Sequence, residues 1–331
     1  MNNQPAQSNE PGTLCLRLDT RGGSENSVWP FAQFHFGGSA AQAENGSGFH
    51  LPLKSLGAAW RENWFLGAPV ETFTTATVRG VRNRQLMLCE LSLPMDGSMY
   101  RTTFELYREL LQFVRESPYE HLVRIWNHIP EIARGEGDEE GYKQFCLARG
   151  YAFDQYFPAQ HPPAGTGVGA EPGKPLHVLA LASRAAPRLL ENPRQVSAFD
   201  YPRQYGPRSP SFSRAVALRG TGSDCLFVSG TASIVGHDSQ HEENLAAQIA
   251  ETLENWEQLF KAYAFGGGRL PGFHDESLYR AYLRHAGDFP AAYSVLESRD
   301  FPLHRTVFLQ AEICRSELLF ELEGVLSLPI T

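Results

Sequence analysis

Two glutamates near the C-terminus have the spacing of side chains that share one face of a strand. Glu321 and Glu323 alternate with Phe320 and Leu322 in the apolar run LLFELEG, and successive side chains of a strand point to opposite faces. Burial raises the pKa of a carboxyl because it penalises the charged form, and such a group can donate a proton at neutral pH. The same alternation is typical of a strand with one solvated face, so the pattern alone leaves a catalytic and a structural interpretation open.

Arginine is the second residue type with an evident chemical use. A guanidinium group binds a carboxylate through two parallel hydrogen bonds, which a lysine cannot do. Three arginines fall within a dozen positions of a chain whose formal charge is −8, namely Arg203, Arg208 and Arg214, and Arg284 and Arg305 are further candidates. These residues predict a site for a small anion. For each of them, a surface position or a structural ion pair is the alternative.

The bulk composition excludes several classes of function. The negative net charge disfavours a nucleic-acid partner, because such affinity comes from clustered basic residues. No apolar stretch approaches the roughly 20 residues that a membrane helix needs, and Met1 to Gly12 lack the basic-then-apolar order of a secretory signal. We therefore expect a cytoplasmic protein with no nucleic-acid and no membrane partner.

Cysteine and histidine give no metal-binding pattern. The five cysteines are scattered without a CxxC spacing, which favours reduced thiols over zinc or redox chemistry. His237 and His241 lie four residues apart in GHDSQH, but no third ligand is evident. We expect no metal and no cofactor, and we interpret these histidines as hydrogen-bonding residues near a helix entry.

Apolar periodicity predicts the elements that must position these side chains. A Pro- and Gly-rich segment at residues 158–175 predicts a linker or loop between an N-terminal α+β domain, 1–157, and a C-terminal domain, 176–331. Upstream, helices are predicted at 100–116 and 139–156 and a strand at 121–129; downstream, strands are predicted at 175–185, 215–229, 278–284, 306–312 and 318–326, and helices at 245–260 and 288–298. The fold class is therefore α+β, with two mixed sheet-plus-helix domains.

The C-terminal half resembles the large family of small trimeric enamine and imine deaminases. The matching elements, in order, are VSG at 228–230, QIAETLENWEQLF at 248–260, YRAYLRHAGDFPAAY at 279–293, Arg305, and FELEG at 320–324. The resemblance implies a deaminase-like fold for this half. It also implies that Arg305 holds a substrate carboxylate and that Glu321 handles the proton or the water.

Further segments narrow the resemblance to the chorismatases. They are YPRQYGPRSPSFSRA at 201–215, SGTASIVGHDSQH at 229–241, RNRQLMLCE at 82–90, HLVRIWNHIPEIARG at 121–135 and AEICRSELLFELEG at 311–324. This resemblance implies an enzyme that acts on chorismate without a metal, as a monomer, with a divergent but related N-terminal half.

The chorismatase resemblance also implies roles for individual residues. Glu321 would protonate the methylene carbon of the enolpyruvyl ether, after which an oxygen nucleophile attacks and pyruvate leaves. The other candidate site residues are Cys314, Ala232, Arg305, Arg208, Arg203, Arg214, Tyr205, Tyr201, Ser229, Gly230, Thr231 and Arg284. Cys314 lies seven residues before Glu321, so it can reach the same face only if a turn or bulge intervenes near 315–317.

The product is left open between two routes. Among chorismatase subgroups, a cysteine at position 314 is associated with formation of 3- or 4-hydroxybenzoate, whereas an alanine at position 232 fits hydrolysis to a dihydroxycyclohexadiene carboxylate. We expect the hydroxybenzoate route. An imine or enamine deaminase and a non-catalytic binder of a small ligand are the remaining alternatives, and incubation with chorismate separates all of them.

Overall fold

The computed structural model describes residues 14–20, 30–36, 48–66, 69–158, 162–171, 173–220 and 222–330. The expectation for Met1 to Gly12 lies outside these ranges, as does any statement on the side chain of Cys15. The described elements form two helix-on-sheet halves and a smaller third sheet. Among the described helices, none combines the length and the apolar character needed to cross a membrane.

The N-terminal half is a six-stranded sheet covered on one face by two helices. The strand order is β10-β9-β11-β8-β7-β6, and the bounds are β6 Glu71–Thr74, β7 Arg79–Arg82, β8 Leu86–Leu93, β9 His121–Ile129, β10 Ala164–Gly169 and β11 Leu176–Ser183. Helix α1 spans Met99–Glu116 and α2 spans Gly141–Tyr156. Leu106, Leu110 and Val114 of α1 are fully buried in the core beneath the helices, since they recur at the spacing of one helix face.

The C-terminal half repeats this architecture with a seven-stranded sheet. Its order is β12-β13-β14-β19-β17-β18-β4, and the bounds are β4 Lys54–Ser55, β12 Arg188–Leu190, β13 Ala215–Arg219, β14 Ser223–Ala232, β17 Glu276–Leu283, β18 Thr306–Gln310 and β19 Phe320–Pro329. Helix α3 spans Leu245–Phe265 and α4 spans Phe289–Ser298. Asn244 caps α3 by accepting a hydrogen bond from Ala247 N at 3.0 Å.

Smaller elements complete the chain. The third sheet has the order β1-β5-β2-β3, with β1 Leu14–Thr20, β2 Ala32–Phe36, β3 Gly48–His50 and β5 Trp60–Leu66. A short hairpin joins β15 Ile234–Val235 to β16 Asp238–Ser239. Short 3-10 turns lie at 137–139, 198–200, 203–205, 286–288 and 303–305.

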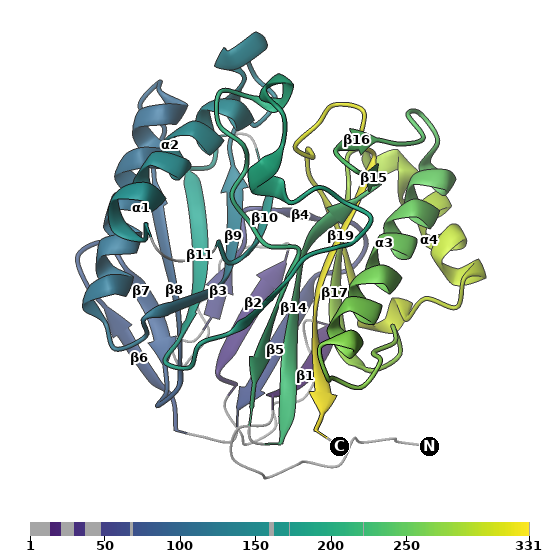
Figure 1. The fold of residues 1–331 in the computed structure, drawn as a ribbon, viewed down its shortest axis with the longest axis horizontal. Helices are drawn as coiled ribbons and strands as arrows, with labels where there is room; N and C mark the ends of the chain where they lie inside the picture. Colours follow the sequence, from purple (N-terminus) through teal and green to yellow (C-terminus); the bar gives the residue numbers. More distant parts are fainter. Residues whose placement is uncertain are drawn as a thin grey trace.

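The halves are arranged so that their helices face outward and their sheets face inward. Figure 1 shows α1 and α2 on one side of the molecule and α3 and α4 on the opposite side, with the strands between them. One hydrophobic core joins all three sheets. Trp64 of β5 lies at its centre, with ring centroids 6.0 Å from Trp126 of β9 and 5.9 Å from Phe227 of β14. Side chains that face inward from β9, β14 and β19 therefore meet in the interior.

The predicted α+β class is confirmed, and the helices lie close to their expected ranges. The main difference concerns residues 158–175, where the structure places β10 instead of a linker, and β11, expected in the C-terminal domain, pairs with β8 and β9. The glycines of β10 permit close packing: a Cβ on Gly165 would lie 3.1 Å from Phe212 Cβ, and one on Gly169 would lie 3.0 Å from Glu312 Cβ. The glycine content that predicted flexibility serves contact with the C-terminal half.

Candidate active site

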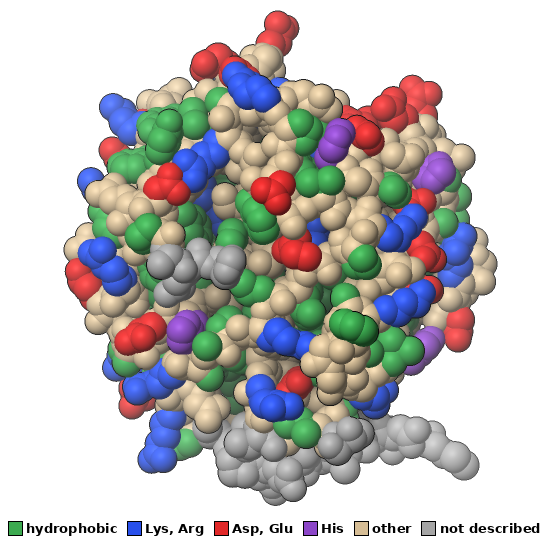
Figure 2. Space-filling model, viewed as in Figure 1, with side chains coloured by type: hydrophobic (Ala, Val, Ile, Leu, Met, Phe, Trp, Pro, Cys, Tyr) green, Lys and Arg blue, Asp and Glu red, His purple; other side chains and the backbone are tan. Residues whose placement is uncertain are grey.

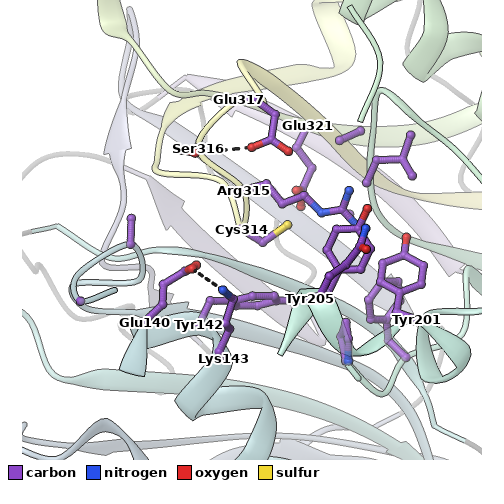
Figure 3. A pocket seen from close by; sticks show the side chains of 18 of the residues that line it. Glu140, Tyr142, Lys143, Tyr201, Tyr205, Cys314, Arg315, Ser316, Glu317 and Glu321 are labelled. Atoms are coloured by element: carbon purple, nitrogen blue, oxygen red, sulfur yellow. Dashed lines mark hydrogen bonds and ion pairs between the residues drawn. The ribbon is translucent and has the colours of Figure 1, made fainter. Parts of the chain in front are cut away.

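A cavity of about 370 Å³ lies where the two halves meet. Its wall combines residues of both halves, namely Ala133, Gly135, Glu140, Tyr142, Lys143, Tyr201, Gln204, Tyr205, Pro210, Phe212, Arg214, Gly230, Ala232, Ile234, Cys314, Arg315, Ser316, Glu317 and Glu321. Figure 3 shows the segment from Cys314 to Glu317 on one side, Tyr201 and Tyr205 on another, and Glu140, Tyr142 and Lys143 at the start of α2 below. The cavity therefore forms only where the two halves pack together.

A smaller recess of about 50 Å³ adjoins the cavity. The two share Tyr142, Pro210, Phe212, Gly230, Cys314 and Glu321, and the recess adds Asn127, Phe145, Cys146, Arg149, Gly165, Thr166 and Gly167. Glu321 thus lies at the junction of the two spaces. A ligand could extend a small group into the recess while its larger part occupies the cavity.

Glu321 has the environment of a proton donor. It lies on β19 between Ala232 of β14 and Tyr282 of β17, and it is 5% exposed. Burial, followed by the neighbouring Glu323 carboxylate, raises the pKa of Glu321 to about 8. The carboxyl is therefore mostly protonated at neutral pH, as a general acid requires.

Glu323 lies on the same face of β19 but has an entirely different environment. It accepts hydrogen bonds from Arg124 Nη2 at 2.6 Å, Trp126 Nε1 at 3.0 Å and Arg280 Nη1 at 3.1 Å. The hydroxyl of Thr166 also donates to it. Glu323 does not line the cavity or the recess. Its role is to accept these hydrogen bonds and to act on Glu321 through its charge.

Gly230 gives Glu321 its space. It lies where the pairing of β14 with β19 shifts register, between Val228 and Thr231. A Cβ at this position would overlap Oε1 of Glu321 and lie 3.1 Å from Oγ1 of Thr166. Its backbone N–H donates to Thr166 Oγ1 at 2.9 Å. The absence of a side chain lets the carboxyl group stand against the β14 backbone.

Three arginines in the walls retain unused hydrogen-bond donors. Arg149 in the recess and Arg214 and Arg315 in the cavity each have one buried N–H nitrogen, Nη2, Nε and Nη2 respectively, with no partner among the described residues. Arg214 also donates to Tyr201 Oη at 2.8 Å, and the Arg315 guanidinium stacks 4.0 Å from the Tyr205 ring centroid. Buried donors without partners are rare in folded proteins, and these three belong to arginines that line the two spaces.

The structure brings several further predicted residues to the cavity. Tyr201, Tyr205, Ala232 and Cys314 line it. A turn at 316–317 separates Cys314 from β19. Such a turn is what Cys314 needs to reach the same face as Glu321, seven residues later. Burial raises the pKa of the Cys314 thiol to about 12, so this side chain is a neutral thiol at physiological pH.

Other predicted residues lie outside both linings, because they are committed to structural contacts. Arg203 pairs with Asp138 at 2.5 Å, and Arg208 binds both carboxylate oxygens of Asp154 at 2.7 Å. These ion pairs fasten the segment between η3, which spans Arg203–Tyr205, and β13 to the N-terminal half. A polar or charged side chain whose partner lies more than 50 residues away gives no sequence signal of that pairing.

Arg284 and Arg305 also do not reach the cavity. Arg284 donates to the carbonyls of Leu318, Ile313 and Arg315 at 2.8, 2.9 and 2.6 Å, and thereby fixes the loop that carries Cys314. Arg305 precedes β18 and makes a 3.5 Å contact with the carbonyl of Asp275, the residue before β17. Glu321 pairs near the other end of that strand.

The remaining predicted residues support the wall from behind. Ser229 accepts from Gly165 N at 2.9 Å and donates to the carbonyl of Ser213, and Thr231 donates to the carbonyl of Ser229 at 2.9 Å. His237 lies with Nδ1 3.2 Å from the Tyr205 hydroxyl. Within the described ranges, no group of three or more His, Cys, Asp or Glu side chains is placed to hold a metal ion.

Sequence reasoning missed Arg149, Arg315 and Tyr142. Arg149 is 4% exposed on α2, where a buried arginine breaks the apolar periodicity. Arg315 directly follows Cys314 and lies in a segment that the chorismatase resemblance already covers. Tyr142 lines both spaces, and no local pattern distinguishes it from a core aromatic residue.

Known proteins with a similar sequence or fold identify the family. The family model described as "Chorismatase FkbO/Hyg5-like, N-terminal" matches residues 62–182. A 3-hydroxybenzoate synthase of Streptomyces hygroscopicus is 33% identical over 274 residues, which are 80% of this chain and 80% of the relative. A chorismatase of Streptomyces rapamycinicus is 33% identical over 278 residues, which are 81% of this chain and 83% of the relative. A chorismatase crystal structure matches with a TM-score of 0.85 and 26% identity, covering 96% of this chain and 99% of that one. The resemblance predicted from the motifs is confirmed: the chain belongs to the chorismatase family.

Proposed function

We propose that the protein cleaves the enolpyruvyl ether of chorismate to pyruvate and a hydroxybenzoate, with Glu321 as the proton donor. The observation that carries this proposal is a buried carboxyl with a pKa raised to about 8 at the junction of two spaces. Arginines that each retain an N–H group without a partner in the described ranges line those same spaces. Membership of the chorismatase family, with a 3-hydroxybenzoate synthase among the relatives, supplies the substrate class.

The two carboxylates of chorismate fit the distribution of these arginines. The enolpyruvyl carboxylate is attached to the carbon next to the methylene carbon that must be protonated, so it has to lie close to Glu321. The recess of about 50 Å³ with Arg149 suits that small group, and the cavity of about 370 Å³ suits the ring. Arg214 and Arg315 would then hold the ring carboxylate through charge-assisted hydrogen bonds.

The chemistry follows from the position of the acid. Glu321 delivers its proton to the terminal methylene carbon, and the adjacent carbon becomes an oxocarbenium-like centre that leaves as pyruvate after attack by an oxygen. The wall residues Tyr142 and Phe212 limit access of water to this point. The carboxylate formed on Glu321 can then take up the proton that the substrate releases.

The hydroxybenzoate route consumes no water. Chorismate has the combined composition of pyruvate and a hydroxybenzoate, whereas hydrolysis adds one water molecule. Cys314 and Ala232 line the same cavity as Glu321, and a neutral thiol beside the acid fills space that an attacking water would need. We therefore propose that an oxygen of the substrate itself takes part and that the ring aromatises.

One chain supplies both walls of the cavity, and we propose that a monomer is sufficient for turnover. We also place the enzyme in the cytoplasm, where its free cysteines Cys89, Cys146, Cys225 and Cys314 stay reduced. Size-exclusion chromatography with an activity assay across the peak tests the first point. Activity confined to a larger species would contradict it.

The decisive experiment is incubation of the purified protein with chorismate, followed by separation of the products. Pyruvate together with 3- or 4-hydroxybenzoate is expected, and a dihydroxycyclohexadiene carboxylate as the main product would favour hydrolysis. In Cys314→Ala the enlarged space should admit water and shift the ratio toward hydrolysis, with pyruvate release changing by less than the ratio. An unchanged ratio would remove Cys314 from control of the product, and no pyruvate from the wild type would overturn the function.

A further inference from the structure

A chain of alternating charges is buried behind the cavity. It runs from Glu62 on β5 to Arg280 on β17, then to Glu323 on β19 and Arg124 on β9. Arg280 Nε and Nη2 lie 2.9 and 3.1 Å from the two oxygens of Glu62. All four side chains are almost completely buried. One chain of ion pairs thus joins all three sheets.

The chain is balanced without Glu321. Its two carboxylates and two guanidinium groups sum to zero charge, because arginine stays protonated in proteins. Ionisation of Glu321 would add an unbalanced negative charge next to Glu323. Of the cations around Glu321, Arg124 and Arg284 are those that favour its charged form. Both are engaged elsewhere: Arg124 with Glu323, and Arg284 with three loop carbonyls.

We propose that the Glu62–Arg280–Glu323–Arg124 chain keeps Glu321 protonated by holding the guanidinium of Arg124 against Glu323. This inference rests on the proposed function, in which Glu321 is the proton donor. Glu323 and Arg124 are positioning residues, since neither lines the cavity or the recess. Thr166 connects this network to the site: it donates to Glu323 and accepts from Gly230 N, beside the Glu321 carboxyl.

The same arrangement explains how the acid is restored after each turnover. Once Glu321 has delivered its proton, two carboxylates share one buried face of β19, and like charge favours renewed protonation. The ionisable groups that act on Glu321 from the surrounding elements are Glu323 on β19, Arg124 on β9, Arg284 after β17, Tyr142 on α2 and Cys314 on the loop. Tyr142 and Cys314 are neutral near pH 7, because burial raises the pKa of each.

Two substitutions should move the pKa of Glu321 in opposite directions. Glu323→Gln removes the neighbouring anion and frees Arg124, so the pKa should fall by about one unit. Arg124→Gln removes a cation, so the pKa should rise. A purely structural role would leave this pKa in place or move it the same way in both variants. Opposite shifts are therefore specific to the electrostatic role.

The measurement is the basic limb of the pH dependence of kcat/KM for pyruvate release. A limb displaced to lower pH in Glu323→Gln and to higher pH in Arg124→Gln supports the proposal. A limb that coincides with the wild type in either folded variant overturns it, as does a shift in the same direction. If one variant does not fold, the other carries the test, because each has its own expected direction.

An infrared titration separates this inference from the proposed function and needs no turnover. The protonated-carboxyl band of Glu321 is the one that disappears in Glu321→Gln, and its titration reports the group directly. A band that titrates near 4 to 5 in the wild type, the ordinary carboxyl range, overturns the inference even if neither charge variant folds. Full activity of Glu321→Gln would instead remove the proposed function and leave the titration result standing.

Discussion

Glu321 and Glu323 lie two residues apart on the same face of one strand, and their surroundings give them opposite properties. Four groups donate hydrogen bonds to Glu323, which joins it to a buried network of arginines. Glu321 faces an open cavity, and its pKa is raised to about 8. Residue type and strand alternation are the same for both. The difference teaches that the neighbours from β9, β14 and β17, not the local sequence, separate a proton donor from a structural anion.

The largest expected effect on the rate comes from changing Glu321, the glutamate that faces the cavity. Glu321→Gln keeps the shape of the side chain but removes the transferable proton, so pyruvate release should fall by roughly 10²- to 10⁴-fold. Folding should persist, because the amide needs no counterion. Glu312→Gln is the matched control, since Glu312 is exposed and outside both linings. Full activity of a folded Glu321→Gln protein would show that Glu321 is not the proton donor, and the two glutamates would then not differ in function.

A second test displaces Glu321 without changing its chemistry. In Gly230→Ala the added Cβ overlaps the carboxyl oxygen, and the flexible glutamate should move while the strand stays in place. A misplacement of about 1 Å can cost ~10²-fold in rate, so kcat should fall on that scale with a nearly unchanged melting temperature. The control is Gly272→Ala, where a Cβ meets nothing within 4 Å. Wild-type kcat in Gly230→Ala would show that the contact at Gly230 does not set the position of the acid.

A third test compares two arginines, of which one lines the site and the other has a structural contact, as in the comparison of the two glutamates. Arg149 lines the recess and has an N–H nitrogen without a partner in the part of the chain that the structure describes, whereas Arg305 lies outside both linings. A hydrogen bond to a charged group contributes about 1.5–3 kcal/mol, so Arg149→Lys should lower kcat/KM by about 10- to 100-fold. Arg305→Lys should change it little. The reverse result would favour the role that the deaminase resemblance implies for Arg305.

The sequence was most informative where one local pattern has one physical meaning. The stripe of Ile249, Leu253, Trp256 and Phe260 predicted helix α3, because apolar side chains at this spacing can be buried together only on a helix. Alternation placed Glu321 and Glu323 on one face. The segment 158–175 was misjudged, since alternate glycines in a packed strand resemble the composition of a flexible loop.

The arginines show why the rest of the site was less predictable. The sequence predicts Arg203 and Arg208 as ligands of the substrate carboxylates. In the folded chain they form ion pairs with Asp138 and Asp154 instead. Arg149 on α2 and Arg315 after Cys314 come from segments remote from each other in sequence. The N–H groups that these two arginines leave without a partner among the described residues can be identified only from the packing of both halves. The sequence predicts arginine as the side chain that binds the anion, whereas the partner of each arginine depends on the tertiary fold.

The pH dependence of kcat/KM for chorismate tests the central claim most directly. An acid is active in its protonated form, which is complete well below its pKa and is lost as the pH rises through it. With the pKa of Glu321 raised to about 8, activity should be level near pH 6 to 7 and fall tenfold per unit well above 8, a limb absent from the residual activity of Glu321→Gln. Activity that instead rises with pH through 4 to 5, the ordinary carboxyl range, would mean that Glu321 acts as a carboxylate and would contradict the account.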